Sequence, residues 1–227
     1  MRLQGMTHTV EILEASPVTH NVRRLRVEKP DGYRFTPGQA TLVGIDRDGW
    51  REERHPFTFT SLNEWDDLEF TIKIYPDHDG LTARIGELAA GDRLILEDPW
   101  GTINYKGPGT FIAGGAGVTP FIAILRARNA EGGLAGHRLI FANKTERDII
   151  LREEFEAMPG LECVWVVTDD DSAPEHMQGF VDRDFLKRHV EDNTQNFYVC
   201  GPDDMVDDIK SILTEMGAEP DALTFEE

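Results

Sequence analysis

The chain has 227 residues, of which 40% are hydrophobic and 29% charged, a balance typical of a globular protein with room for two small domains. Its 42 acidic residues against 23 basic ones give a formal net charge of −19, which disfavours binding to nucleic acid or to an anionic membrane surface. We find no apolar run near the ~20 residues of a membrane helix and no signal-peptide pattern at the start, so we expect a cytoplasmic protein.

Cysteine usage limits the redox chemistry. Only Cys163 and Cys200 occur, so we expect neither a disulfide framework nor an iron–sulfur cluster held by four thiolates. No Cys-x-x-Cys or His-x-x-His spacing points to a metal site. Any redox chemistry of this chain is therefore expected to use an organic cofactor.

Short β-branched and aromatic segments, separated by turn residues, fill the first half of the chain. The predicted strands are Thr9–Ala15, Asn21–Glu28, Gln39–Asp46, Pro56–Ser61, Leu68–Tyr75 and Asp92–Asp98. One helix, from about Thr82 to Leu88, interrupts them. Six short strands at close spacing predict an antiparallel β barrel, in a domain that we assign to residues 1–107.

Apolar strands alternate with helical stretches in the second half. The predicted strands are Phe111–Ala113, Arg138–Ala142, Glu162–Val167 and Phe197–Cys200. The predicted helices are Thr119–Asn129, Ile149–Ala157, Asp182–His189 and Asp203–Met216. This alternation predicts a Rossmann-like α/β domain with a parallel sheet, at residues 108–227.

The charge is unevenly distributed. Residues 1–107 hold 13 Lys and Arg against 18 Asp and Glu, whereas the remainder holds 10 against 24. Seven basic residues crowd the first quarter: Arg23, Arg24, Arg26, Lys29, Arg34, Arg51 and Arg54. They form either an ordinary solvated surface or a basic face for an acidic partner.

A ring that can carry charge, an aromatic ring and three hydroxyls follow one another in His55–Ser61, whose sequence is HPFTFTS. By itself the segment is compatible with an ordinary barrel strand. A flat aromatic beside a hydroxyl donor is also what a bound isoalloxazine needs.

An apolar strand leads into glycines and then a helix in Phe111–Pro120, with the sequence FIAGGAGVTP. Glycines let the backbone approach a pyrophosphate closely, and the helix N-terminus offers unpaired N–H groups to its charge. Pro120 suits the first helical turn. A tight turn is the alternative, but the position at the first strand–helix unit of a parallel sheet favours a nucleotide-phosphate loop.

These segments, in this order, resemble those of the ferredoxin–NADP reductase superfamily over nearly the whole chain. HPFT is similar to the flavin motif of ferric reductases and NADPH oxidases, whereas most other members have Arg and Tyr where His55 and Phe57 stand. The resemblance implies FAD as cofactor, with Phe57 against the flavin and Thr58 near its N5. His55 or Arg54 would meet the FAD phosphates, and both remain open.

The resemblance extends to weaker flavin signals. Ile72-Lys73-Ile74 is similar to the family's strand before its lone helix, and Gly80-Leu81-Thr82 to the second flavin motif, in which N–H groups at a helix start hold an anion. Thr82 as an ordinary helix cap is the alternative. Many relatives carry a terminal aromatic that covers the flavin, which makes Phe225 a candidate for that cover.

Two motifs of the second half resemble the family's nicotinamide site. Gly115-x-Gly117-x-x-Pro120 is similar to the pyrophosphate loop, and Cys200-Gly201-Pro202 to the late strand–turn motif in which the cysteine faces the site of hydride transfer. Ordinary packing is the alternative role for Cys200. Cys163 carries no such signature, and we expect it in the core.

The choice of nicotinamide depends on one turn. The stretch 141–152 resembles that of cytochrome b5 reductases, which prefer NADH, and Asp169-Asp170-Asp171 follows the next strand. A carboxylate there would accept the ribose hydroxyls and repel a 2′-phosphate, which favours NADH over NADPH. Lys144 and Arg147 would favour the 2′-phosphate, and an acidic surface turn is a third possibility.

The sequence therefore predicts an FAD-dependent NAD(P)H oxidoreductase that passes electrons to a separate acceptor, first of all flavodoxin or ferredoxin. Ferric chelates, free flavin or a small haem protein are further acceptors, an electron-transfer subunit is an alternative, and a nucleotide-binding module without turnover is an alternative of another class. The predicted catalytic residues are Thr58 and Cys200. The predicted cofactor-binding residues are Arg54, His55, Pro56, Phe57, Thr58, Lys73, Gly80, Leu81, Thr82, Gly114, Gly115, Ala116, Gly117, Thr119, Pro120, Asp169, Cys200, Gly201 and Pro202.

Overall fold

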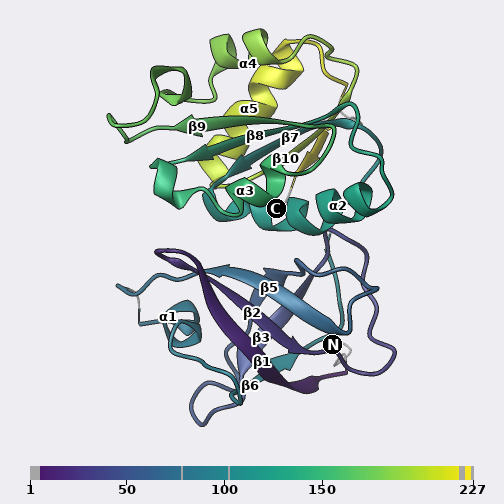
Figure 1. Ribbon diagram of the computed structural model, residues 1–227, viewed down its shortest axis with the longest axis vertical. Coiled ribbons are helices and arrows are strands. Elements are labelled where there is room, and N and C mark those ends of the chain that lie inside the picture. Colours follow the sequence, from purple (N-terminus) through teal and green to yellow (C-terminus); the bar gives the residue numbers. More distant parts are fainter. Residues whose placement is uncertain (1–5, 78, 102, 220–222, 226–227) are drawn as a thin grey trace. The chain divides into compact units, whose positions relative to one another are not determined.

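The computed structural model describes residues 6–77, 79–101, 103–219 and 223–225 (Figure 1). The chain divides into two compact units, Met1–Gly101 and Thr102–Glu227. The domain boundary expected between residues 107 and 108 stays a prediction. Among the described residues, no helix has both the length and the apolar character needed to cross a bilayer.

The first unit is built on a six-stranded antiparallel sheet in the order β4-β3-β6-β1-β2-β5. Its strands are β1 (His8–Thr19), β2 (Val22–Glu28), β3 (Ala40–Ile45), β4 (His55–Thr58), β5 (Asp67–Lys73) and β6 (Arg93–Leu96), and its helix is α1 (Leu81–Ile85). An antiparallel bridge between Phe59 and Phe70 joins the chain just after β4 to β5, so the two edges of the sheet meet. The predicted six-stranded barrel is confirmed.

Apolar side chains that alternate with polar ones along the strands fill the interior of the barrel. Val10 and Ile12 of β1 and Leu25 of β2 are buried, while their polar neighbours face outward. Phe59 is fully buried, and its ring stacks on Phe35 with centroids 4.3 Å apart. These aromatic and branched side chains form one core inside the sheet.

The second unit contains a five-stranded parallel sheet in the order β11-β10-β7-β8-β9. Its strands are β7 (Gly109–Gly114), β8 (His137–Asn143), β9 (Leu161–Val167), β10 (Asn196–Cys200) and β11 (Leu223–Phe225). Its helices are α2 (Thr119–Ala130), α3 (Arg152–Glu156), α4 (Arg183–His189) and α5 (Asp203–Glu215), with three short 3-10 segments, η1 (Gly115–Val118), η2 (Glu146–Asp148) and η3 (Glu175–Met177). The predicted α/β unit with a parallel sheet is confirmed.

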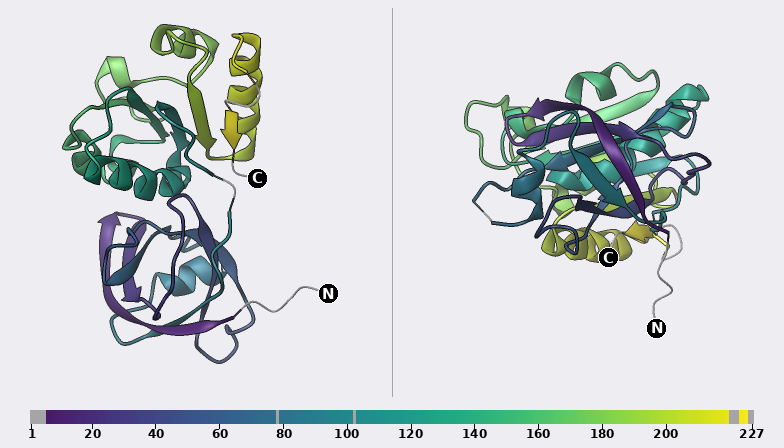
Figure 2. Two further views of the ribbon diagram at one scale, coloured as in Figure 1. Left: turned by 90° about the vertical axis from the view of Figure 1, so that its right-hand side faces the viewer. Right: turned by 90° about the horizontal axis from the view of Figure 1, so that it is seen from below.

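Helices cover both faces of this sheet (Figures 1 and 2). On one face, Phe185 of α4 and Ile209 of α5 pack on Ile112 and Ile140 of the strands. On the other face, Phe111 of β7 meets Phe121 of α2 edge-on, at 5.1 Å between ring centroids. Successive residues of β7 therefore bury their side chains on opposite faces, which explains its continuous apolar run.

Several element ends differ from the sequence predictions by one to four residues, among them those of β1 and α3. β1 continues past Ala15 through Pro17, because irregular register with β2 near Pro17 accommodates a residue without an N–H. The helix expected from Ile149 starts only at Arg152, because Leu151 has a left-handed φ of 53°. The C-terminal strand β11 was not expected at all.

An ion pair between α2 and α3, of which only the cation is buried, generates a stability prediction. Arg126 is 8% exposed, and its guanidinium donates to both carboxylate oxygens of Glu154 at 2.5 and 2.8 Å. Glu154→Gln removes the charge that compensates this cation, so the free energy of unfolding should fall by about 1–3 kcal/mol.

Urea unfolding followed by circular dichroism measures this loss. Glu153→Gln is the matched control, because Glu153 is an exposed neighbour on the same helix, and it should change stability by less than about 0.5 kcal/mol. Equal losses in the two variants would contradict a specific role for the ion pair.

Candidate functional site

The HPFT segment forms β4 on the surface of the barrel. β4 pairs with β3, so that His55 lies opposite Val43 and Thr58 opposite Ala40. His55 is exposed, Phe57 is half-buried and packs against the barrel core, and Thr58 is 7% exposed. The strand therefore holds the Phe57 ring half-buried and Thr58 buried, and it leaves His55 and Pro56 open to solvent.

Arg54 turns toward its own loop. Its Nη1 donates to the carbonyls of Arg51 and, at 3.3 Å, of Glu53, and its Nε lies 3.9 Å from the Glu97 carboxylate. The side chain is 18% exposed, and any Cβ at Gly44 would collide with its guanidinium. Arg54 thus braces the loop between β3 and β4.

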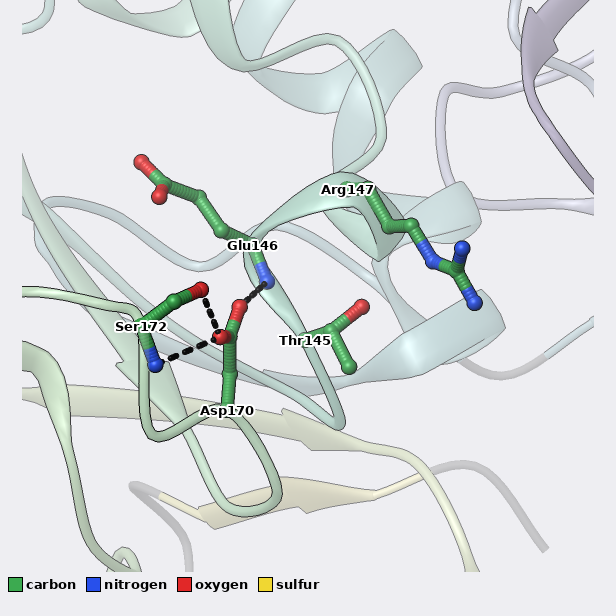
Figure 3. Close-up of a pocket in the computed structure, with 5 residues that line it drawn as sticks. All are labelled: Thr145, Glu146, Arg147, Asp170 and Ser172. Carbon is green, nitrogen blue, oxygen red and sulfur yellow. Dashed lines mark hydrogen bonds between the residues drawn. The ribbon is translucent and has the colours of Figure 1, made fainter.

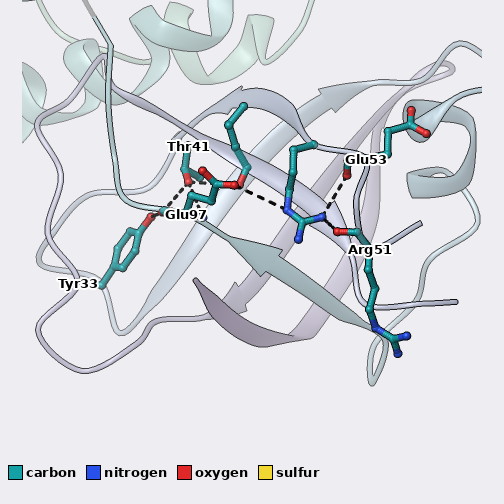
Figure 4. A network of polar contacts seen from close by, with 7 residues as sticks. Tyr33, Thr41, Arg51, Glu53 and Glu97 are labelled. Carbon is teal, nitrogen blue, oxygen red and sulfur yellow. Dashed lines mark hydrogen bonds and ion pairs between the residues drawn. The ribbon is translucent and has the colours of Figure 1, made fainter. Parts of the chain in front are cut away.

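A polar network holds the chain segment against which Arg54 lies. In Figure 4, Tyr33 and Thr41 converge on Glu97. The Tyr33 hydroxyl donates to the Glu97 carbonyl at 2.6 Å, and the Thr41 hydroxyl donates to the same oxygen at 2.7 Å. Burial raises the pKa of Tyr33 to about 12, so its phenol remains a donor at neutral pH.

Glu53 connects β4 to α1. Its Oε1 accepts a hydrogen bond from the backbone N–H of Leu81 at 3.3 Å and lies 3.2 Å from Nε2 of His55. Gly80 is the N-cap residue of α1 and provides no side-chain cap, so Thr82 is not the helix cap considered from the sequence. The first amide of the helix is therefore paired with a carboxylate from the β3–β4 loop.

The other predicted flavin residues lie on the same unit. Lys73 ends β5, and its Nζ lies 5.7 Å from the ring centroid of Tyr75, a side chain that is 44% exposed. Leu81 is fully buried and anchors α1 in the barrel. The side chain of Phe225 lies outside the described residues, so its cover of the flavin stays a prediction.

The two nicotinamide motifs meet at the carboxyl ends of β7 and β10. A Cβ at Gly117 would collide with the carbonyl of Cys200, and one at Gly114 would lie 2.9 Å from Cδ of Pro202 and 2.5 Å from Sδ of Met205. Both positions consequently require glycine, since the two turns touch through their backbones. The structure brings the predicted pyrophosphate loop and the Cys-Gly-Pro turn into direct contact.

Gly115 adopts a left-handed φ of 53° at the start of η1, so the chain turns sharply before α2 begins at Thr119. Gly115, Ala116, Gly117 and Thr119 are half-buried, whereas Pro120 is buried at the first turn of α2. A 12-residue helix that follows a glycine turn can direct its N-terminal N–H groups at an anion.

Cys200 is the last residue of β10 and is 6% exposed. It pairs with Ala113 of the central strand β7, so it lies at the carboxyl edge of the sheet beside the glycine loop. Cys163 of β9 is half-buried, and burial raises the pKa of its thiol to about 11. The core position expected for Cys163 is therefore not found, because β9 is the edge strand of the sheet.

A hollow of about 590 Å³ lies at the segments that follow β8 and β9 (Figure 3). It is lined by Thr145, Glu146, Arg147, Asp170 and Ser172. Asp170 accepts from the N–H of Glu146 at 3.0 Å and from the N–H and hydroxyl of Ser172 at 3.1 and 2.5 Å. The Glu146 N–H lowers the pKa of Asp170, with smaller contributions from Ser172.

One residue of the acidic turn, Asp170, and one of the basic pair, Arg147, line this hollow. Asp169 is exposed, and its N–H donates to the Lys144 carbonyl at 2.8 Å, which ties the turn after β9 to the turn after β8. In Figure 3 the Arg147 side chain points away from Asp170. The acid that faces the hollow is therefore Asp170 rather than Asp169, the position favoured from the sequence.

Two features escaped the sequence analysis. Phe180, 68% exposed, lines an apolar hollow of about 410 Å³ together with Ala142, Thr168 and Met205. Glu53 was not singled out, because only the fold brings it to Leu81. The one sequence signal for Phe180 is an aromatic after Gly179, two residues before the cap of α4.

Models of two protein domains match the chain in the order of its two units. The model of an FAD-binding domain matches residues 7–92, and that of an oxidoreductase NAD-binding domain matches residues 111–211. The chain belongs to the ferredoxin–NADP reductase and cytochrome b5 reductase family. It is an oxidoreductase with an FAD-binding and a nicotinamide-binding domain, and the predicted cofactors FAD and NAD(P) are confirmed.

Relatives of this reductase family differ in their partners. NADH-cytochrome b5 reductase 1 of Bos taurus is 27% identical over 88% of this chain and 78% of its own length. The ferredoxin–NAD(P)+ reductase component of naphthalene 1,2-dioxygenase/salicylate 5-hydroxylase systems from Ralstonia is 26% identical over 89% of this chain and 63% of its own. A ferredoxin NADP+ reductase from Neisseria gonorrhoeae, solved with bound FAD and NADP, has the same fold, with a TM-score of 0.84, 20% identity and coverage of 97% and 98%.

The contact between Gly117 and Cys200 generates a prediction for nicotinamide binding. Gly117→Ala places a methyl group against the Cys200 carbonyl, so the two turns must separate. We expect the KM for NAD(P)H to rise on the order of tenfold, with little change in the spectrum of the bound flavin.

Steady-state kinetics with an artificial acceptor measures this change. Gly133→Ala is the control, since its new methyl would lie 3.8 Å from the nearest non-adjacent atom. A Gly117→Ala enzyme with the KM of the wild type would show that the close approach of the turns is not needed for binding.

Proposed function

We propose that this reductase takes hydride from NADH onto FAD and delivers electrons to a separate acceptor, with flavodoxin or ferredoxin as the first choice. The observation that carries the proposal is the contact between the glycine loop 114–120 and the turn 200–202 at the carboxyl edge of the parallel sheet. Ligands of open α/β sheets bind at this edge, where helix N-termini also converge.

The residues of the barrel fit a flavin. Phe57 offers a half-buried ring, Thr58 a hydroxyl on the same strand, and Gly80 an open turn at which even a Cβ would meet nothing within 4 Å. In the proposed complex Phe57 contacts the isoalloxazine and Thr58 donates near its N5. His55 faces the phosphates, because the Arg54 guanidinium already has partners in its own loop and lies near Glu97. When bound, FAD would supply the chemistry that takes up two electrons as hydride and releases them one at a time.

The residues of the second unit fit a dinucleotide. The glycine loop receives the pyrophosphate, and Cys200 together with Gly201 and Pro202 orients the nicotinamide ring. The apolar hollow at Phe180 is adjacent, because Met205 lines it and also lies beside Gly114. Its size and its exposed aromatic suit an adenine ring.

The electron acceptor is proposed from the relatives and from the protein's charge. Relatives are named as reductases of cytochrome b5 or as ferredoxin-reducing components of dioxygenase systems. A basic face for an acidic partner receives little support, because Arg26 is paired with Asp67 and Glu14, and Arg51 with Asp46 and Asp48. Docking is therefore expected to depend on shape and on cations such as Arg34, for which no acidic partner is seen among the described residues.

The proposal is tested with the purified protein and its visible spectrum. We expect a yellow protein that releases FAD on denaturation and is bleached by NADH without oxygen, because both cofactor domains are present. Mass analysis identifies the cofactor, and stopped-flow absorbance gives the reduction rate. A protein that binds both nucleotides but never bleaches would be a binding module without turnover.

Nicotinamide selectivity gives a further prediction. NADH should be preferred over NADPH, because a carboxylate beside the ribose repels a 2′-phosphate. Replacing Asp169 and Asp170 by Asn should lower the ratio of kcat/KM for NADH to kcat/KM for NADPH roughly tenfold. The measurement is kcat/KM for NADH and NADPH in both proteins. Asp171→Asn, which removes an exposed charge outside the hollow, is the control.

The opposite selectivity would overturn this assignment. If the wild type prefers NADPH and Lys144→Ala or Arg147→Ala abolishes that preference, the basic pair selects the cofactor and the acidic turn is only surface.

A further inference from the structure

The cations of the loop between β3 and β4 already have partners within the first unit. Arg51 pairs with Asp46 at 2.6 Å and with Asp48, and Arg54 donates to loop carbonyls and lies near Glu97. Arg47 pairs with Asp92 at 2.9 Å. His55 is the fourth cation-capable side chain of this segment, and it lies beside Glu53. The segment that the proposed function assigns to the FAD phosphates therefore offers them no cation without a competing internal partner.

Glu53 holds two groups at once. Its Oε1 accepts from the Leu81 N–H at 3.3 Å and lies 3.2 Å from Nε2 of His55, and its side chain is 40% exposed. Under the proposed function, these are the two donors that the FAD diphosphate would meet. A carboxylate oxygen and a phosphate oxygen accept hydrogen bonds with similar geometry, so they compete for the same donors.

We propose that Glu53 is an internal anion that occupies the flavin-phosphate donors when FAD is absent and must leave them when FAD binds. This inference rests on the proposed function. Its consequence is that FAD must displace an internal carboxylate when it binds, so the affinity of this chain for FAD is lower than the two donors alone would allow.

Electrostatics makes the proposal specific to one part of the flavin. A carboxylate that remains near the diphosphate repels it, and a carboxylate that leaves must give up its two contacts, so either way Glu53 weakens FAD. FMN has one phosphate and should be weakened less. Riboflavin has none, so its affinity should not depend on the charge of Glu53.

The experiment compares three flavins and two variants of the full chain freed of flavin. Glu53→Gln removes the charge, and Glu52→Gln is the matched control, because Glu52 is exposed and no ion pair of its side chain is seen in the described residues. Quenching of flavin fluorescence at low salt gives Kd for FAD, FMN and riboflavin. Melting temperatures verify that all proteins are folded.

Glu53→Gln should tighten FAD about tenfold, tighten FMN less, and change riboflavin by less than about twofold. Glu52→Gln should leave all three close to the wild type, since an exposed charge is well screened. The gain for FAD should also shrink as salt is raised.

Three results overturn the inference alone. The first two are an FAD affinity that Glu53→Gln leaves unchanged or weakens, and an equal gain for riboflavin and FAD. A gain for FAD that Glu52→Gln reproduces does the same, because general charge would explain it. A folded wild type that binds none of the three flavins overturns the proposed function as well, so the two failures are distinguishable.

Discussion

The close approach of two backbones at the edge of the parallel sheet constrains the whole second unit. Gly114 and Gly117 lie so near the turn 200–202 that no side chain fits between them. β7 and β10 must therefore be neighbours, in parallel and in register, although more than eighty residues separate them in sequence. The alternating helices supply the crossovers that parallel neighbours require.

Carboxylates on backbone amides recur at the positions where nucleotides are expected. Glu53 accepts from the first amide of α1, Asp170 from the amide at the start of η2, and Asp148 from the Thr145 N–H that precedes it. In a chain with 42 acidic residues, such contacts give hydrogen-bond acceptors to backbone N–H groups that a bound ligand could otherwise pair with. A nucleotide must then displace these carboxylates or bind beside them, which links the acidity of the chain to its selectivity.

Sequence patterns were reliable wherever local chemistry decides the outcome. Six strands with turn residues between them predicted the barrel, and Phe111–Pro120 predicted the strand, glycine turn and helix. They were less reliable where tertiary contacts override propensity, as at Leu151, whose left-handed φ delays α3, and at Pro17, which β1 includes. Arg54 illustrates the same limit, because its partners come from the loop geometry and from Glu97.

The sequence by itself determined the order of the two units, the glycine loop and the Cys-Gly-Pro turn, since each depends on residue types at fixed spacing. Only the tertiary structure decided that these two motifs touch, and that Asp170 rather than Asp169 faces the hollow. It alone brought Glu53 to Leu81, 28 positions away. The physical reason is that hydrogen-bond partners distant in sequence are chosen by strand pairing and loop closure, which no local pattern encodes.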